Sequence, residues 1–176
     1  MTKQDTSNNL RNQVWVLIHS AHDLIVKNEE EIFRLQAGVS YQHFMVLMAM
    51  ESVGKPVKEA VLVRLLQRNP NTVSMITDRM EKLGLVRKLR SLTDRRLVEV
   101  ELTKTGKAKF KEAFKIGNDL VQRLVPDFSD EELKQFINLL DKVASHAASE
   151  IGLKDEPAEV AANNIRNLAK TIKIIS

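Results

Sequence analysis

The sequence predicts a mainly helical fold with one small β-hairpin, and three observations lead to this expectation. Apolar residues recur at helical spacing in several long segments on both sides of the middle of the chain. The runs over residues 85–90 and 97–102 are instead rich in Leu and Val, and the second alternates apolar with mainly acidic residues. A polar turn with two arginines, over residues 91–96, separates these runs. A hairpin set among helices is therefore expected.

The first third of the chain is expected to be helical. Residues 6–36 carry apolar side chains at mixed three- and four-residue spacings, which indicates one long helix. Ser40 is a good N-cap for a second helix, which should end near Gly54. Residues 56–57 can supply a short strand to the hairpin, before a third helix over residues 58–67.

A capped amphipathic helix is expected over residues 70–83. Asn69 is a suitable N-cap, and Pro70 suits the first helical position, where its missing N–H would have had no partner. Gly84 can end the helix in a left-handed conformation. Small polar side chains lie largely off the apolar stripe and can approach base edges or phosphates closely, although a solvated helix face is the alternative. They belong to Asn71, Thr72, Ser74, Thr77 and Asp78. The stripe consists of Val73, Ile76, Met80 and Leu83.

Two further long helices are expected after the hairpin. Thr103 caps the first, and Pro126 marks the break before the second. A capping box over residues 129–132 starts the second helix, which carries one apolar stripe from Leu133 to Ala147. A long first helix with two long C-terminal helices is a common way to build a helical dimer interface, and symmetric dimers are the commonest oligomers. An intramolecular bundle is the alternative.

The expected organisation has four parts. Residues 1–36 form an N-terminal dimerisation helix, and residues 37–102 form a DNA-binding unit. Residues 103–150 form C-terminal dimerisation helices, and residues 151–176 form an extra amphipathic helix that we expect to pack across the dimer. A frayed tail and a membrane-surface helix are the alternatives for this last part.

Positive charge is concentrated around the predicted helix and hairpin. Nine basic and three acidic residues lie between Arg64 and Arg96, so this stretch has a net charge of +6, whereas the whole chain has +4. Such a concentration is typical of nucleic-acid binding. A helix followed directly by a hairpin with arginines at its tip is a winged helix-turn-helix. This unit places a helix in the major groove of DNA and an arginine in the minor groove.

The run TVSMITDRMEKLGLVRK, followed by DRR and then LTKTG, resembles the MarR family of winged-helix transcriptional regulators. The resemblance is strong over residues 57–107 and weaker over the flanks, where it concerns mainly the helix layout. It implies an obligate homodimer that reads a pseudo-palindromic operator, usually as a repressor released by a small ligand. The fold class is thus a mainly α fold with a small β-wing, a winged helix-turn-helix with N- and C-terminal dimerisation helices.

The resemblance also implies roles for single residues. Arg96 enters the minor groove, and Asp78 pairs with it to hold the wing against the helix; the alternative partner of Asp78 is Lys82, four residues on. Met75 and Leu83 depart from the family pattern, because many relatives carry basic or polar residues there. The candidate DNA-binding residues are Asn71, Thr72, Ser74, Met75, Arg79, Lys82, Arg90, Arg95 and Arg96, and the wing-orienting candidates are Asp78 and Asp94.

A pocket for a small aromatic effector is a further expectation. It should lie where the dimer helices meet the winged unit, the region where relatives bind aromatic or phenolic effectors; plain core is the alternative for such a cluster. Three histidines, His19, His22 and His43, make a metal site conceivable, but isolated histidines are more often solvated or hydrogen-bonded, so no metal or cofactor is expected. The candidate pocket residues are Trp15, His19, Tyr41, Phe44 and Met48.

Composition narrows the class of function. The chain has 176 residues and no cysteine, so one core is expected, without disulfides or thiolate chemistry. Nucleophile–base pairs, glycine-rich phosphate loops and Glu/His metal signatures are absent from the sequence, which argues against an enzyme. No apolar run is long enough to span a bilayer, and a cytoplasmic protein is expected.

The expected function is that of a sequence-specific regulator that binds double-stranded DNA. We expect a ligand-responsive repressor that acts as a homodimer on a pseudo-palindromic operator. Two alternatives remain: a winged helix used only for protein–protein contacts, and a metal-responsive regulator.

Overall fold

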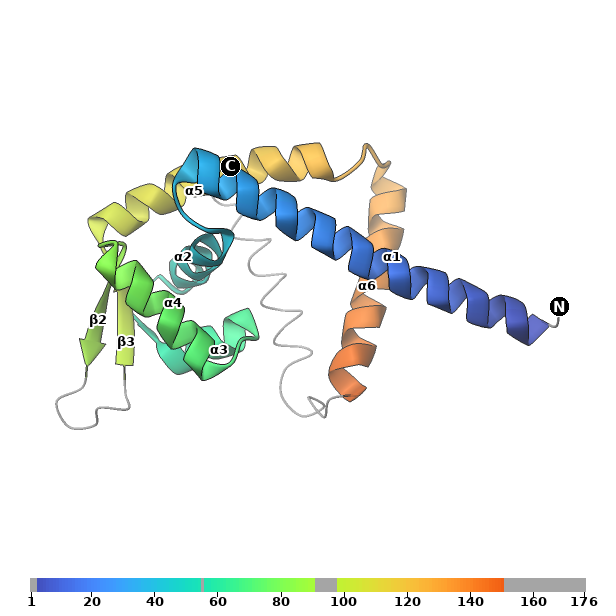
Figure 1. The fold of residues 1–176 in the computed structure, drawn as a ribbon, viewed down its shortest axis with the longest axis horizontal. Helices are drawn as coiled ribbons and strands as arrows, with labels where there is room; N and C mark the ends of the chain where they lie inside the picture. Colours follow the sequence, from blue (N-terminus) through green and yellow to red (C-terminus); the bar gives the residue numbers. More distant parts are fainter. Residues whose placement is uncertain (1–2, 55, 91–97, 151–176) are drawn as a thin grey trace.

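The computed structural model describes residues 3–54, 56–90 and 98–150 (Figure 1). Its helices are α1 (Lys3–Ile32), the π-helical turn η1 (Phe33–Ala37), α2 (Tyr41–Val53), α3 (Glu59–Leu66), α4 (Pro70–Lys82), α5 (Lys104–Leu124) and α6 (Asp130–Glu150). Its strands are β1 (Val57–Lys58), β2 (Val86–Arg90) and β3 (Val98–Leu102). The predicted mainly helical fold with a small β-wing is confirmed. The extra helix predicted over residues 151–176 lies outside the described residues.

The three strands form one antiparallel sheet in the order β1-β3-β2. Val100, in the middle of β3, pairs with Val57 on one side and with Lys88 on the other. Val57 and Val100 are both buried, so the sheet presents one face to the helices. The short strand expected just before α3 is therefore present, and it ties the start of the helix-turn-helix to the hairpin.

Side-chain caps fix where the helices begin, as the sequence predicts. The Ser40 hydroxyl accepts a hydrogen bond from the backbone N–H of His43 (3.1 Å), and the Asn69 side chain accepts one from Thr72 (2.8 Å). These bonds satisfy N–H groups that lack a partner in the first turn. At the start of α6, Glu132 accepts hydrogen bonds from the backbone N–H and the hydroxyl of Ser129, which completes the predicted capping box.

A three-residue turn joins α3 to α4 and sets the angle between them. Gln67 ends α3 in a left-handed conformation, with φ of 50°. The backbone N–H of Arg68 then donates to the carbonyl oxygen of Val63 at 3.2 Å, which closes the helix end. Leu62 and Val73, one from each helix, are fully buried, so the two helices form one packed unit.

The base of the hairpin is attached to α5. The hydroxyl of Thr103 donates to the carbonyl oxygen of Gly84 at 2.7 Å, and the backbone N–H of Thr103 donates to that of Leu85 at 3.1 Å. A Cβ atom on Gly106 would lie 1.9 Å from the Leu85 carbonyl oxygen, so a side chain at this position would push α5 off the hairpin. The LTKTG motif thus holds the hairpin to the helix that leads toward α6.

The hydrophobic core lies between α2, α4, α5, η1 and the sheet. Aromatic rings from η1, α2 and α5 pack together in this core. The ring centre of Phe33 lies 4.6 Å from that of Phe44, and the ring centre of Phe44 lies 6.3 Å from that of Phe110. Much of α1 and α6 lies outside this core. In Figure 1, the N-terminal part of α1 extends to one end of the molecule, while α4 and the hairpin occupy the other end.

Candidate nucleic-acid interface

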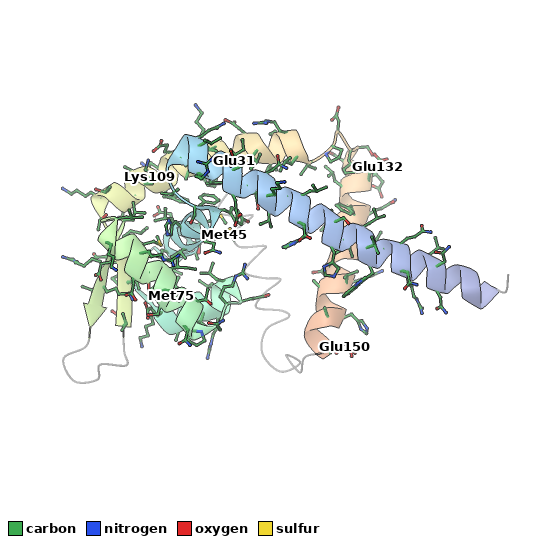
Figure 2. All side chains as sticks on the ribbon, in the orientation of Figure 1. Glu31, Met45, Met75, Lys109, Glu132 and Glu150 are labelled. Carbon is green, nitrogen blue, oxygen red and sulfur yellow. The ribbon has the colours of Figure 1, made fainter. Side chains whose placement is uncertain are left out.

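Helix α4 presents a polar and basic face to solvent. Its buried side chains, Val73, Ile76 and Met80, pack on the core. Met75, labelled in Figure 2, lies off that stripe and is 56% exposed, although it is apolar. The other candidate contact residues of α4 are exposed or half-buried, namely Asn71, Thr72, Ser74, Arg79 and Lys82.

Thr77 is a departure from the sequence expectation. It was expected among the polar residues off the apolar stripe, but it is fully buried. Its hydroxyl lies 2.5 Å from a carboxylate oxygen of Glu59, at the start of α3, and 3.0 Å from the carbonyl oxygen of Ser74. Because these acceptors satisfy the hydroxyl inside the protein, Thr77 serves to join α3 to α4.

The principal electrostatic feature beside α4 is the ammonium group of Lys88, on β2. Its nitrogen lies 2.5 Å from an Asp78 carboxylate oxygen and 2.9 Å from Glu59 Oε1. The Lys88 side chain is only 4% exposed. Its backbone N–H donates to Glu81 at 2.7 Å. We call these four residues, Glu59, Asp78, Glu81 and Lys88, the Lys88 cluster.

The two carboxylates keep Lys88 charged. Burial by itself would lower the pKa of Lys88, but hydrogen bonds to Asp78 and Glu59 and the attraction of their charges outweigh it, so the pKa is raised. The described partner of Asp78 is therefore Lys88, not the alternative partner Lys82. Arg96, the partner implied by the family resemblance, lies outside the described residues, so that ion pair stays a prediction.

The tip of the wing also lies outside the described residues. This applies to Asp94, Arg95 and Arg96, and for Arg90 the structure describes the backbone only. Strand β2 ends at Arg90 and β3 begins at Val98, so the tip follows directly from paired strands.

A half-buried histidine on α2, His43, lies near Arg79 of α4. The Nδ1 atom of His43, on α2, is buried, with no hydrogen-bond partner among the described residues. Burial lowers the pKa of His43, and the nearby positive charge of Arg79 lowers it further. Burial and the charge of Arg79 therefore both favour the neutral form of His43.

A second feature is an apolar cavity of about 750 Å³ between α1, α2 and α6. Glu29 and Tyr41 provide polar groups at its wall and hydrogen-bond to each other. Burial raises the pKa of the Glu29 carboxyl, and burial together with Glu29 raises the pKa of Tyr41 to about 12. Its apolar lining includes Val14, Leu17, Ile25, Met45, Phe136 and Leu140.

The structure does not bring the five predicted pocket residues together in this cavity. Tyr41 lines it, whereas Trp15 is 67% exposed and packs edge-on against His19 on the outside of α1. Phe44 and Met48 are buried in the core, so the plain-core alternative is correct for them. Composition cannot tell which side of a helix faces a cavity when both sides are apolar.

Sequence reasoning missed the Lys88 cluster, although a signal was present. Val86 and Lys88 are two residues apart on one strand and so point to the same face. Because Val86 is buried against the helices, Lys88 must also point inward, and an inward lysine needs carboxylate partners. Glu59 was not singled out, because an acidic residue in the first turn of a helix is common.

Two other expectations concern metals and membranes. Within the described ranges, no three His, Asp or Glu side chains gather closely enough to hold a metal ion. In the same part of the chain, no helix combines the length and apolar character needed to cross a bilayer.

Comparison with known proteins places these features in context. The model of the MarR family matches residues 37–97. The chain is 25% identical to the HTH-type transcriptional repressor MdtR of Bacillus subtilis over 113 residues, which cover 64% of this chain and 72% of that protein.

Two solved structures share the fold. The organohalide-sensing regulator RdhR-CbdbA1625 in its 2,4-dichlorophenol-bound form aligns with a TM-score of 0.71 and 24% identity, over 85% of this chain and 86% of that one. A MarR variant from E. coli complexed with operator DNA aligns with a TM-score of 0.62 and 23% identity, over 75% of this chain and 96% of that one. The arrangement of α2, α3, α4 and the hairpin is thus a recurrent one.

Proposed function

We propose that this chain is a MarR-family transcriptional regulator that binds double-stranded DNA as a homodimer. Helix α4 is then the recognition helix, which enters the major groove, and the β2–β3 hairpin is the wing, which reaches the adjacent minor groove. The protein acts as a regulator in the cytoplasm and not as an enzyme.

The observation that carries this proposal is the exposed face of α4. The helix is capped at Asn69, packs on the core through one stripe and leaves Asn71, Arg79 and Lys82 in solvent. Amide side chains can bind base edges, and basic side chains can bind bases and phosphates. The β2–β3 hairpin leads to the arginines predicted at the tip of the wing.

The homodimer is supported by apolar side chains that the single chain leaves in water. Leu17 on α1 is 66% exposed, and Ile137 on α6 is 65% exposed. Large apolar side chains left in solvent along two helices are typical of an interaction site. A second copy would cover it and would place two recognition helices on one duplex, so that each copy raises the effective concentration of the other.

The most direct test of the proposed function is to measure binding to DNA at several salt concentrations. DNA fragments that the protein selects from its source genome should bind with an affinity that falls steeply as salt rises, on the order of 10³-fold between 50 and 200 mM. That fall reports the release of counterions from phosphates. An affinity that stays constant with salt, or no selection at all, would instead support a winged helix used for protein–protein contacts.

We further propose that the protein is a repressor released by a small apolar effector that binds in the cavity between α1, α2 and α6. MdtR is named a repressor, and the RdhR-CbdbA1625 regulator was solved with 2,4-dichlorophenol. The cavity has the volume and apolar lining of a small-molecule site. Replacing Ala21, in its wall, by Phe should abolish the release of DNA by chlorinated phenols and leave DNA binding itself unchanged. Release that persists in the Ala21→Phe variant would contradict this assignment.

A further inference from the structure

We propose that Lys88 is the positioning residue that holds the wing against the recognition helix, so that the two DNA-contacting parts move as one body. This inference rests on the DNA-binding function proposed above. It assigns to Lys88 a task that the family resemblance gives to an arginine at the tip of the wing.

Lys88 attaches β2 to α4 at two points. Its ammonium group binds Asp78, and one turn further along α4 the carboxylate of Glu81 accepts the backbone N–H of Lys88. Two contacts from one residue to successive turns fix both the position and the tilt of the strand. A wing that swung away would break both contacts together.

The burial of Lys88 makes this attachment specific. A lysine side chain that is 4% exposed has lost its water, and only well-placed carboxylates compensate for that loss. Any other position of the wing would leave the charge buried without partners or return it to solvent. The neighbouring Arg87 forms a contrast, because its ion pair with Glu101 lies across the sheet and is largely exposed.

A third element joins the same ammonium group. Glu59 begins α3, binds Lys88 and accepts a hydrogen bond from the buried hydroxyl of Thr77. The Lys88 cluster therefore ties α3, α4 and β2 together at one place. A helix-turn-helix and its wing are thereby connected through side chains as well as through the chain itself.

The charge of Lys88 has a second effect close to DNA. Asp78 and Glu81 lie on the recognition helix, where carboxylates are repelled by phosphates unless a cation neutralises them. The Asp78 side chain is half exposed even with Lys88 bound. The Lys88 cluster therefore does not exclude the predicted pair between Asp78 and Arg96.

The test compares Lys88→Met with Arg87→Met in the full chain. Both substitutions remove one positive charge from β2 and keep a long side chain, but only the first removes a contact to α4. Lys88→Met should bind the selected DNA about tenfold more weakly. At saturating protein it should lose hydroxyl-radical protection of the minor groove and keep protection of guanine N7 in the major groove. Arg87→Met should keep both patterns, and Lys88→Arg should restore the minor-groove pattern.

A measurement without DNA separates the two proposals. In Lys88→Met, amide hydrogen exchange should become faster in β2 and β3 and stay unchanged in α5; the double variant Glu59→Gln with Asp78→Asn should do the same if Lys88→Met does not fold. Unchanged exchange, or a minor-groove footprint that survives in Lys88→Met, would overturn the role of Lys88. Failure of the wild-type protein to bind DNA would instead contradict the proposed function, while the exchange result still decides the role of Lys88.

Discussion

The winged unit (α2 to β3) and the outer helices (α1 and α6) differ in how much of their apolar surface a single chain buries. In the winged unit, Val73, Met80 and Val100 are fully buried, and even the charged Lys88 has partners for its charge. On the outer helices, long apolar side chains such as those of Leu17 and Ile137 lie in solvent. The winged unit is therefore fully packed within one chain, whereas α1 and α6 leave large apolar side chains in solvent.

This difference indicates how work is divided within the molecule. Under the proposed function the winged unit needs rigidity, because a recognition helix and a wing must keep a fixed geometry to fit two grooves of one duplex. In the proposed homodimer, the exposed apolar side chains of α1 and α6 are buried against a second copy. The cavity between α1, α2 and α6 lies where the two regions meet, so a molecule bound there contacts both.

The largest expected effect comes from placing a charge on the exposed apolar face of α6. Ile137→Glu should convert the dimer to a monomer, since the interface would have to bury a carboxylate without a partner. DNA binding should weaken on the order of 100-fold, because a monomer loses the gain from two linked sites. Sedimentation and DNA titration measure the two effects.

Asn138→Glu is the matched control for that substitution. It adds the same charge one residue along α6, on the side opposite the predicted apolar stripe, and should leave the dimer intact. If Ile137→Glu stays dimeric with unchanged affinity, the outer helices of this chain do not form the interface, and the contrast between the two regions loses its meaning.

The next largest effect tests an arginine predicted at the tip of the wing. Arg96→Ala should weaken DNA binding about tenfold without changing the dimer or its thermal unfolding, because the predicted role of this arginine is to bind in the minor groove. Fluorescence anisotropy with the selected DNA gives the affinity. Arg87→Ala, which removes an arginine from the same hairpin, is the control and should bind as the wild type does. Equal affinity of Arg96→Ala and wild type would remove the wing tip from the mechanism.

Much of the winged unit could be predicted from sequence, because helix caps and strand alternation depend on residues that are close in the chain. Caps such as Ser40 and Asn69 act within one helical turn, and the alternation in β3 depends on the strand alone. The Lys88 cluster could not be predicted with its partners, since Glu59 and Asp78 come to β2 only after α3 and α4 have packed. A pocket beside the winged unit is expected from sequence, but of its predicted lining residues only Tyr41 lines this cavity, because the lining combines side chains from five helices that meet only in the folded chain.

A smaller effect concerns how the recognition helix reads bases. Met75 is exposed among polar neighbours, and an apolar side chain in the major groove can contact the methyl group of thymine. Replacing one contacted thymine by uracil should weaken wild-type binding about fourfold, the value of one buried methyl group. In Met75→Ala the same replacement should have no effect. If both proteins respond equally at every thymine of the selected site, Met75 reads no methyl group.

The smallest effect lies at the junction of the two regions, where burial raises the pKa of Glu29. A carboxyl group whose pKa is higher in the folded protein favours folding while it is protonated. That contribution is complete below its ordinary pKa of 4.5 and is lost as the pH rises through the folded-state pKa.

Glu29→Gln keeps an acceptor for the Tyr41 hydroxyl and removes the buried charge. The variant should therefore unfold at a higher temperature than wild type at pH 7 and at the same temperature at pH 4. Glu30→Gln, at an exposed position, should match wild type at both pH values. A Glu29→Gln variant that is no more stable at pH 7 would mean that water reaches the carboxylate, and that the junction is as open as the outer helices around it.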